Sequence, residues 1–278
     1  MAAVLQLNNM KFGINASSLP AHVSFSDTVR LLKSYGYDGI ELNLEEDEKA
    51  FLPETFSPGD LETLKRVAEE SEVRISGIST TLLWNSTLSS NDEQERNLAK
   101  QRVRRMIDAA YELGSDTVLV VPGIVDETTS YDVVYDRSIE ALQELGTYAT
   151  SAGVTIGVEN VPNRFLLSPL EWVSYIDHIG SENVGMYLDI GNVRQNGFPE
   201  QWIDVLEHRI VGVHVKDYTA AAGPTLPLLT GDIAWDRVAA SLKWEKFSGW
   251  ISVELPPTKL YPKLLLKHHV SAMQRIFE

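Results

Sequence analysis

The sequence contains no cysteine, no long apolar run and comparatively few basic residues. Without cysteine, disulfides, thiolate metal ligands and cysteine nucleophiles are excluded, so any metal ion must be held by carboxylates and histidines. No apolar run reaches the ~18–20 residues of a membrane span, and residues 1–10 are too short and too polar for a secretory signal. We therefore expect a cytoplasmic protein without membrane contact.

The charge balance is acidic. The 278 residues include 39 acidic and 24 basic side chains, which gives a formal net charge of −15. Nucleic-acid binding needs a basic surface against the phosphate backbone, so this balance argues against a nucleic-acid partner. The hydrophobic fraction of 44% and charged fraction of 23% are those of a globular protein. No linker or low-complexity tract divides the chain, and we expect one domain over residues 1–278.

Short β-rich apolar runs alternate with helical patterns along the whole chain. Several runs are continuously apolar, such as Val118–Val121, which is typical of a parallel strand buried on both faces. The eight runs are Lys11–Asn15, Gly39–Leu44, Arg74–Ser79, Thr117–Val121, Thr155–Glu159, Val184–Asp189, Ile210–Val215 and Trp250–Leu255.

The segments between the runs have helical spacing and end in glycine. One helical face carries Ala99, Val103, Met106, Ala110 and Leu113, at steps of four and three residues. Gly114 follows this face, and Gly36 and Gly153 end two other helical patterns in the same way, as left-handed caps do. Eight strand–helix units in a chain of this length predict an α/β fold, a (β/α)₈ TIM barrel. An open doubly wound sheet is the alternative.

Ligand-type side chains stand near the ends of the last four runs. They are Glu159, Asp189, His214 and Glu254. Enzymes with this fold act at the carboxyl ends of their strands, and neighbouring strands lie ~5 Å apart. We therefore expect the four side chains at equivalent heights, converging on one point. Three carboxylates and one imidazole suit Mn²⁺, Mg²⁺, Co²⁺ or Zn²⁺, and the oxygen count favours Mn²⁺ or Mg²⁺.

The joint pattern matters more than any single member. A lone glutamate at a strand end is usually solvated, and a lone histidine in an apolar run is usually a core residue. A buried carboxylate is costly unless it is paired or metal-bound. One such residue at the end of each of four consecutive strands therefore calls for a common explanation, and a bound cation supplies it.

Around these residues the chain resembles the sugar phosphate isomerase/epimerase family of xylose-isomerase-like TIM barrels. The subgroup it resembles includes L-xylulose and L-ribulose 5-phosphate 3-epimerases and hexulose phosphate isomerases. The stretches that carry the resemblance are Val158–Asn163, Leu188–Val193, Val213–Asp217, Leu229–Trp235 and Ser252–Pro257. The resemblance implies one divalent metal ion, most often Mn²⁺, held by Glu159, Asp189, His214 and Glu254. It also implies that Glu159 and Glu254 act as the acid/base pair.

The chemistry of the residues agrees with that implication. Moving a proton beside a carbonyl needs a polarised carbonyl, a base and an acid, and the intermediate is a cis-enediolate. Return of the proton to the opposite face gives epimerisation, and its return to the neighbouring carbon gives aldose–ketose isomerisation. Two facing carboxylates favour the first outcome, which predicts 3-epimerisation of a ketose. Whether the sugar carries a phosphate stays open.

Further residues are candidates for contacts with the substrate. Lys216 and Asp217 follow His214 directly and are within reach of sugar hydroxyls, although an ordinary ion pair at the barrel mouth is equally consistent. The other candidates are Glu41 for a sugar hydroxyl, Trp84 as an apolar lid or as packing, Arg164 as an anion clamp, and Asn160 and Asn192 as hydrogen-bond partners that orient the ligands.

Rival functions follow from the same residues. A keto-cyclitol dehydratase of the inosose type would use the same metal and the same proton abstraction, and a catalytically silent sugar-binding barrel would keep only the fold. The abasic-site endonucleases of this fold need further histidines at the ends of strands two and three and beside the aspartate of strand six; here only His214 stands at a strand end, and Asn192 replaces the histidine beside Asp189. A homodimer or homotetramer is expected, with Leu264–Leu266 as one contact surface.

Overall fold

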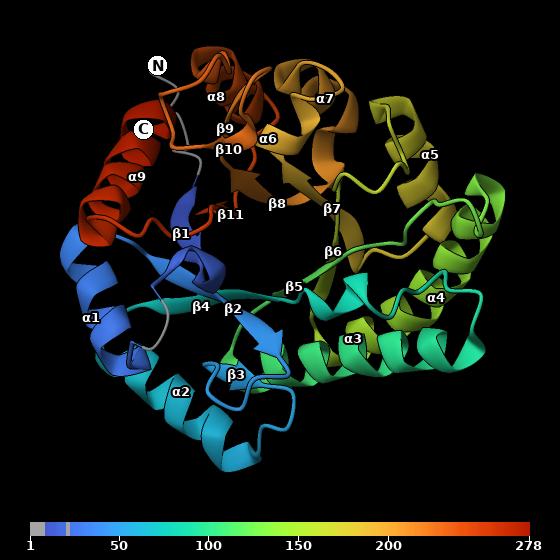
Figure 1. Ribbon diagram of the computed structural model, residues 1–278, viewed down its shortest axis with the longest axis horizontal. Coiled ribbons are helices and arrows are strands. Elements are labelled where there is room, and N and C mark those ends of the chain that lie inside the picture. Colours follow the sequence, from blue (N-terminus) through green and yellow to red (C-terminus); the bar gives the residue numbers. More distant parts are fainter. Residues whose placement is uncertain (1–8, 21–22) are drawn as a thin grey trace, which may run out of the picture.

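The computed structural model describes residues 9–20 and 23–278, in which eight parallel strands form a ring inside a layer of helices (Figure 1). Residues 1–10 were expected not to form a secretory signal, and residues 1–8 of that segment lie outside the described residues. The barrel strands are β1 (Lys11–Asn15), β2 (Gly39–Glu45), β4 (Arg74–Ser79), β5 (Thr117–Val120), β6 (Thr155–Glu159), β7 (Val184–Asp189), β8 (Ile210–Val215) and β11 (Trp250–Val253).

Pairing between the first and last strands closes the barrel. β1 pairs in parallel with β2 on one side and with β11 on the other, where Lys11 lies opposite Trp250 and Ile14 opposite Val253. The remaining strands follow one another around the ring in chain order. The open doubly wound sheet is therefore wrong, and the (β/α)₈ barrel is confirmed.

The helices begin and end at residues whose chemistry favours those boundaries. Gly36, Gly114 and Gly153 have positive φ angles at the ends of three helices, as expected for left-handed caps. The helices are α1 (Phe25–Tyr35), α2 (Pro58–Glu70), α3 (Glu93–Leu113), α4 (Tyr131–Ala152), α5 (Pro169–Ile179), α6 (Ile190–Val193), α7 (Pro199–Leu206), α8 (Trp235–Trp244) and α9 (Pro262–Phe277).

Three short strands lie at the carboxyl end of the barrel. The strand β3 (Leu52–Pro53) extends the pairing of β2, and β9 (Asp217–Thr219) and β10 (Gly223–Leu226) form a hairpin after β8. Two expected strand ends are shorter than predicted, since β5 stops at Val120 and β11 at Val253. The residues beyond these points already belong to the loops of the barrel mouth.

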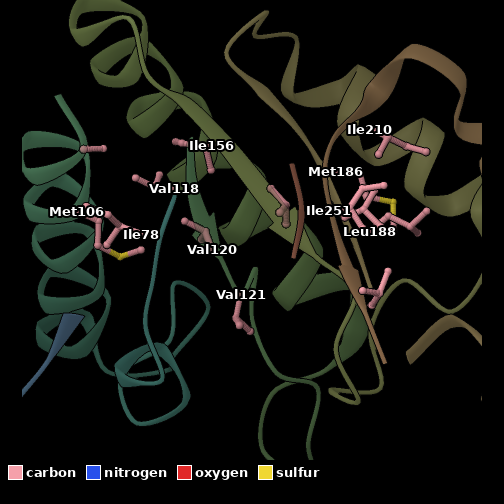
Figure 2. Packing of buried hydrophobic residues seen from close by; sticks show 14 of the residues in the cluster. Ile78, Met106, Val118, Val120, Val121, Ile156, Met186, Leu188, Ile210 and Ile251 are labelled. Carbon is pink, nitrogen blue, oxygen red and sulfur yellow. The ribbon is translucent and has the colours of Figure 1, made fainter. Parts of the chain in front are cut away.

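The strands place branched apolar side chains toward the helices and keep glycine and polar side chains for the barrel interior. Ile156 and Val158 of β6, and Met186 and Leu188 of β7, belong to the buried hydrophobic layer, and Figure 2 shows Met106 of α3 pointing toward Ile78 of β4. Because successive side chains alternate between faces, Glu159, Tyr187 and Asp189 face inward. This alternation leaves the barrel interior polar below the mouth.

The three leucines expected at a contact surface do not share one face of α9. Leu264 is 69% exposed, whereas Leu266 is buried in the core. Three consecutive helical residues span about 200° around the axis, so they cannot all face outward. The prediction that Leu266 belongs to a contact surface is therefore wrong, and the oligomeric state stays a prediction. Within the described part of the chain, no helix has the length and apolarity to cross a membrane.

The helix α9 buries a histidine that should make stability depend on pH. The side chain of His269 is buried, and neither ring nitrogen has a hydrogen-bond partner among the described residues. Burial, assisted by the neighbouring His268, lowers its pKa from 6.5 to about 4. Below pH 6.5 the unfolded chain binds a proton that the folded chain accepts only near pH 4, so acid weakens the fold.

We expect the free energy of unfolding to fall by about 2 kcal/mol between pH 7 and pH 5 through this group alone. Urea unfolding of wild type and His269→Leu at both pH values measures this share. The variant should lose less stability on acidification by that amount. The exposed His208, changed to Gln, is the control, and an equal pH dependence in His269→Leu would contradict the prediction.

Candidate metal centre

Four side chains from neighbouring strands meet at the carboxyl end of the barrel. Each of Glu159, Asp189, His214 and Glu254 offers one oxygen or nitrogen atom, and these atoms all lie within 4.8 Å of one another. Asp189 and His214 are fully buried, and Glu254, just after β11, is the most exposed member, at 31% of its side chain. The convergence expected from the sequence is therefore present.

The four residues do not stand at equivalent heights, as was expected. Asp189 lies opposite His214 in the β7–β8 register, but Glu159 lies opposite Tyr187, two residues earlier on β7. His214 in turn lies opposite Ser252, two residues before Glu254. Strands in a closed barrel are tilted and staggered, so residues at shifted register positions come together at the mouth.

Two carboxylates hold the ring of His214 in place. Its Nε2 lies 3.0 Å from an oxygen of Glu41, and its Nδ1 lies 3.0 Å from Glu159 and 3.6 Å from Glu254. Nε2 donates its proton to Glu41, so a cation that displaces the proton from Nδ1 would meet a ring nitrogen already directed at the cluster. The carboxylate of Glu41 is buried beneath the histidine and is engaged there, which suits it to orient this candidate ligand, while its expected contact with a sugar hydroxyl stays a prediction.

Sequence reasoning missed the tyrosine that supports Glu41. Tyr187 of β7 donates its hydroxyl proton to Glu41 across the barrel, at 2.7 Å. Its ring fills space left by Gly157 and Gly212, where an added Cβ would lie 2.8 and 2.5 Å from the ring. The signal was available, because Tyr187 precedes Asp189 by two residues and so faces the same way, and the two neighbouring strands carry Gly157 and Gly212 near it, with Gly212 directly opposite.

Asn160 and Asn192 fix the position of Asp189. The side chain of Asn160 accepts a hydrogen bond from the backbone N–H of Asp189 and donates one to its carbonyl. Asn192 donates to the carbonyl of Asn160, and its own N–H donates to Asp189 Oδ1 at 2.8 Å. These contacts leave Asp189 Oδ2 as the oxygen directed at the cluster, and the orienting role of both asparagines toward a metal ligand stays a prediction.

Lys216 reaches into the same cluster. Its Nζ lies 2.7 Å from Asp189 Oδ2 and 2.7 Å from Glu254 Oε2. The ion-pair partners of Lys216 are thus two of the candidate metal ligands, and the neighbouring Asp217, with which an ordinary ion pair was the alternative, is engaged elsewhere.

Asp217, the next residue, turns away from the cluster. Its buried carboxylate accepts hydrogen bonds from the Tyr218 N–H and from Trp235 Nε1, which ties the loop after β8 to α8. The structure therefore shows Asp217 engaged by this loop and by α8, while a contact of Lys216 with substrate stays a prediction.

Two other candidates lie around the mouth. Trp84 is 38% exposed in a short 3₁₀ turn, Leu82–Trp84, whose two leucines are buried, so only the tryptophan is available as a lid. Arg164 is exposed, with a positive φ angle, at the rim of a cavity of about 300 Å³. Asn160 and Asn192 line the same cavity, so it adjoins the cluster. Roles in covering substrate and in binding an anion stay predictions.

Burial and neighbouring charges shift the pKa values of the two glutamates in opposite directions. Burial, together with the charge of Glu254, raises the pKa of Glu159 to about 7. Burial would also raise the pKa of Glu254, but His214 and Lys216 outweigh it and lower that pKa to about 2. Burial opposes a charge on His214, yet Glu41 and Glu254 raise its pKa well above the usual value. The cluster thus attracts positive charge strongly.

The donor set fits a divalent cation. Three carboxylates and one imidazole nitrogen converge from four strands, His214 presents one ring nitrogen, and hydrogen bonds hold the backbone of Asp189. Ligands oriented by such outer hydrogen bonds are typical of protein metal sites. The cluster is therefore a candidate metal centre; oxygen-rich sites of this kind suit Mn²⁺ and Mg²⁺ as well as Zn²⁺ and Co²⁺.

Comparison with known proteins finds related chains over most of the length. The family model described as xylose isomerase-like TIM barrel matches residues 29–275. An uncharacterized protein from Methanocaldococcus jannaschii, MJ1311, is 28% identical over 255 residues, which are 88% of this chain and 84% of the relative. L-ribulose-5-phosphate 3-epimerase UlaE from Salmonella paratyphi A is 23% identical over 252 residues, 87% of this chain and 86% of UlaE.

Among solved structures, a D-psicose 3-epimerase crystallised in the presence of D-fructose superposes with a TM-score of 0.82. The superposition covers 96% of this chain and 99% of that chain, at 16% sequence identity. At this identity the likeness concerns the fold, and it agrees with the closed barrel described above.

The contact between Glu41 and His214 generates a testable expectation. Changing Glu41 to Gln removes the negative charge behind the imidazole and weakens His214 as a donor, so we expect the dissociation constant for Mn²⁺ to rise roughly 10–100-fold. Isothermal titration calorimetry on the purified protein measures it. Glu48→Gln, an exposed change in the loop after β2, should bind like wild type, and unchanged binding by Glu41→Gln would refute the orienting role.

Proposed function

The chain belongs to the xylose isomerase-like TIM barrel family, and from this premise we propose that it is a metal-dependent sugar epimerase that inverts carbon 3 of a ketose or ketose phosphate. The proposal includes Mn²⁺ as the cofactor and Glu159, Asp189, His214 and Glu254 as its ligands. The names of UlaE and of the D-psicose 3-epimerase support this reaction class.

The single observation that carries the proposal is the placement of the two glutamates. Glu159 and Glu254 come from the outer members of four adjacent strands, with Asp189 and His214 between them. A sugar bound over the cluster would therefore have one carboxylate on each side. Removal of a proton by one glutamate and delivery of a proton by the other, from the opposite face, inverts a carbon centre.

The remaining residues would prepare this proton transfer. A divalent cation bound by the four ligands would act as a Lewis acid toward the negative charge that develops on the carbonyl oxygen. Glu41 and Tyr187 keep the imidazole of His214 aimed at the cluster, and Asn160 keeps Asp189 in place. Fixed ligand geometry keeps the two glutamates at constant positions through the reaction.

The substrate is a small sugar in this proposal. The cavity beside the cluster is rimmed by Arg164, whose guanidinium suits a phosphate or a sugar hydroxyl. Trp84 is the candidate for an apolar cover. The choice between a phosphorylated and a free ketose depends on these loop residues, so both belong in the substrate panel.

We expect solvent hydrogen to enter the product at one carbon. Incubation of a panel of ketoses and ketose 5-phosphates with the protein and Mn²⁺ in deuterated water should give a C3 epimer that carries deuterium at C3, detected by NMR. Glu159→Gln and Glu254→Gln should each slow this exchange at least about 10²–10⁴-fold, since each removes one proton-transfer group.

The matched control is Glu127→Gln, an exposed change in the loop after β5 at the same end of the barrel. It should exchange at the wild-type rate. Loss of water from a keto-cyclitol, without epimer formation from any sugar, would replace the proposal with a dehydratase. Sugar binding without exchange of any carbon-bound hydrogen would identify a silent binding protein.

A further inference from the structure

The side chain of Lys216 extends into the candidate metal site. Its ammonium touches Asp189 Oδ2 and Glu254 Oε2, both at 2.7 Å. Asp189 Oδ1 already accepts the Asn192 N–H, so Oδ2 is the oxygen left for a cation. Glu254 Oε2 is likewise the oxygen that faces His214 Nδ1, at 3.6 Å. The lysine is therefore bound to the same atoms that a metal ion would need.

The fold makes room for this lysine. Its stem passes over Gly191, where an added Cβ would lie 2.5 Å from Lys216 Cγ and 3.0 Å from the Lys216 carbonyl oxygen. Any larger residue at position 191 would displace the stem. Only 11% of the Lys216 side chain is exposed, so the stem is largely covered between Gly191 and the ammonium.

A divalent cation and the ammonium exclude each other at this position. All ligand atoms lie within 4.8 Å of one another, which leaves room for one cation between them. Two positive groups in contact there would repel strongly in a site with little water. The carboxylates of Asp189 and Glu254, in contrast, each form an ion pair with the ammonium at 2.7 Å.

We propose that Lys216 is a built-in competitor of the metal ion: loading exchanges its ammonium for the cation and releases it to the barrel mouth. This inference rests on the metal site of the proposed function but not on its reaction. The ammonium stabilises the carboxylates when no metal is supplied.

Replacing Lys216 with Met keeps an unbranched stem and removes the charge. Without added metal, Asp189 and Glu254 then lack a counter-charge, so we expect the melting temperature to fall by roughly 5–10 °C. Affinity for Mn²⁺, measured by calorimetry without any sugar, should rise at least about tenfold because no competitor remains. Calorimetry and thermal melts of Lys33→Met, which breaks an exposed ion pair with Glu72, provide the matched control and should show neither change.

A second measurement uses only the wild-type chain and does not depend on the folding of a variant. Reductive methylation with formaldehyde, quantified by peptide mass spectrometry, reports the accessibility of each lysine. Saturating Mn²⁺ should increase the modification rate of Lys216 several-fold and leave that of the exposed Lys267 unchanged.

The outcomes separate this inference from the reaction. Mn²⁺ binding that is equal or weaker in Lys216→Met, or unchanged reactivity of Lys216 on loading, overturns the exchange even if wild type proves to be an epimerase. Tighter binding by the variant together with exposure of Lys216 supports the exchange even if no ketose reacts. Absence of Mn²⁺ binding in both chains overturns the exchange and the metal centre together.

Discussion

The concentration of negative charge at the end of the barrel is the constraint on which the rest of the site depends. Glu41, Glu159, Asp189 and Glu254 lie in or directly beneath one small, largely buried cluster. Such a cluster is stable only when positive charge is present within it. His214 and Lys216 are the positive groups that the chain itself supplies, and a divalent cation is the group that the donor set suits.

The barrel interior holds side chains that support this cluster, and it is not an ordinary apolar core. Inward positions on several strands are glycine or polar, and the ring of Tyr187 fills the space that two glycines leave. The resulting chain of hydrogen bonds runs from Tyr187 through Glu41 to His214. The apolar packing that stabilises the fold lies outside the barrel, between strands and helices (Figure 2).

The same separation explains how distant relatives share the fold at low sequence identity. The outward layer needs only apolar side chains of suitable volume, which many sequences provide. The site needs particular residues at the strand ends, while the loops around it are free to vary. Trp84 and Arg164 belong to these loops, and they are where we expect differences between substrates to be encoded.

The sequence by itself determined the eight strands, the glycine caps of the helices and the four converging ligand-type residues, because each has a local signature: a short apolar run, a glycine after a helical face, a polar residue ending a strand. Only the tertiary structure decided that Glu41 orients His214, that Tyr187 crosses the barrel, and that Lys216 binds the ligand oxygens. Two of these contacts join residues that are far apart in the chain: Tyr187 and Glu41 are separated by 146 positions, and His214 and Glu41 by 173. They depend on the tilt and stagger of the closed barrel, which no local pattern in the chain specifies.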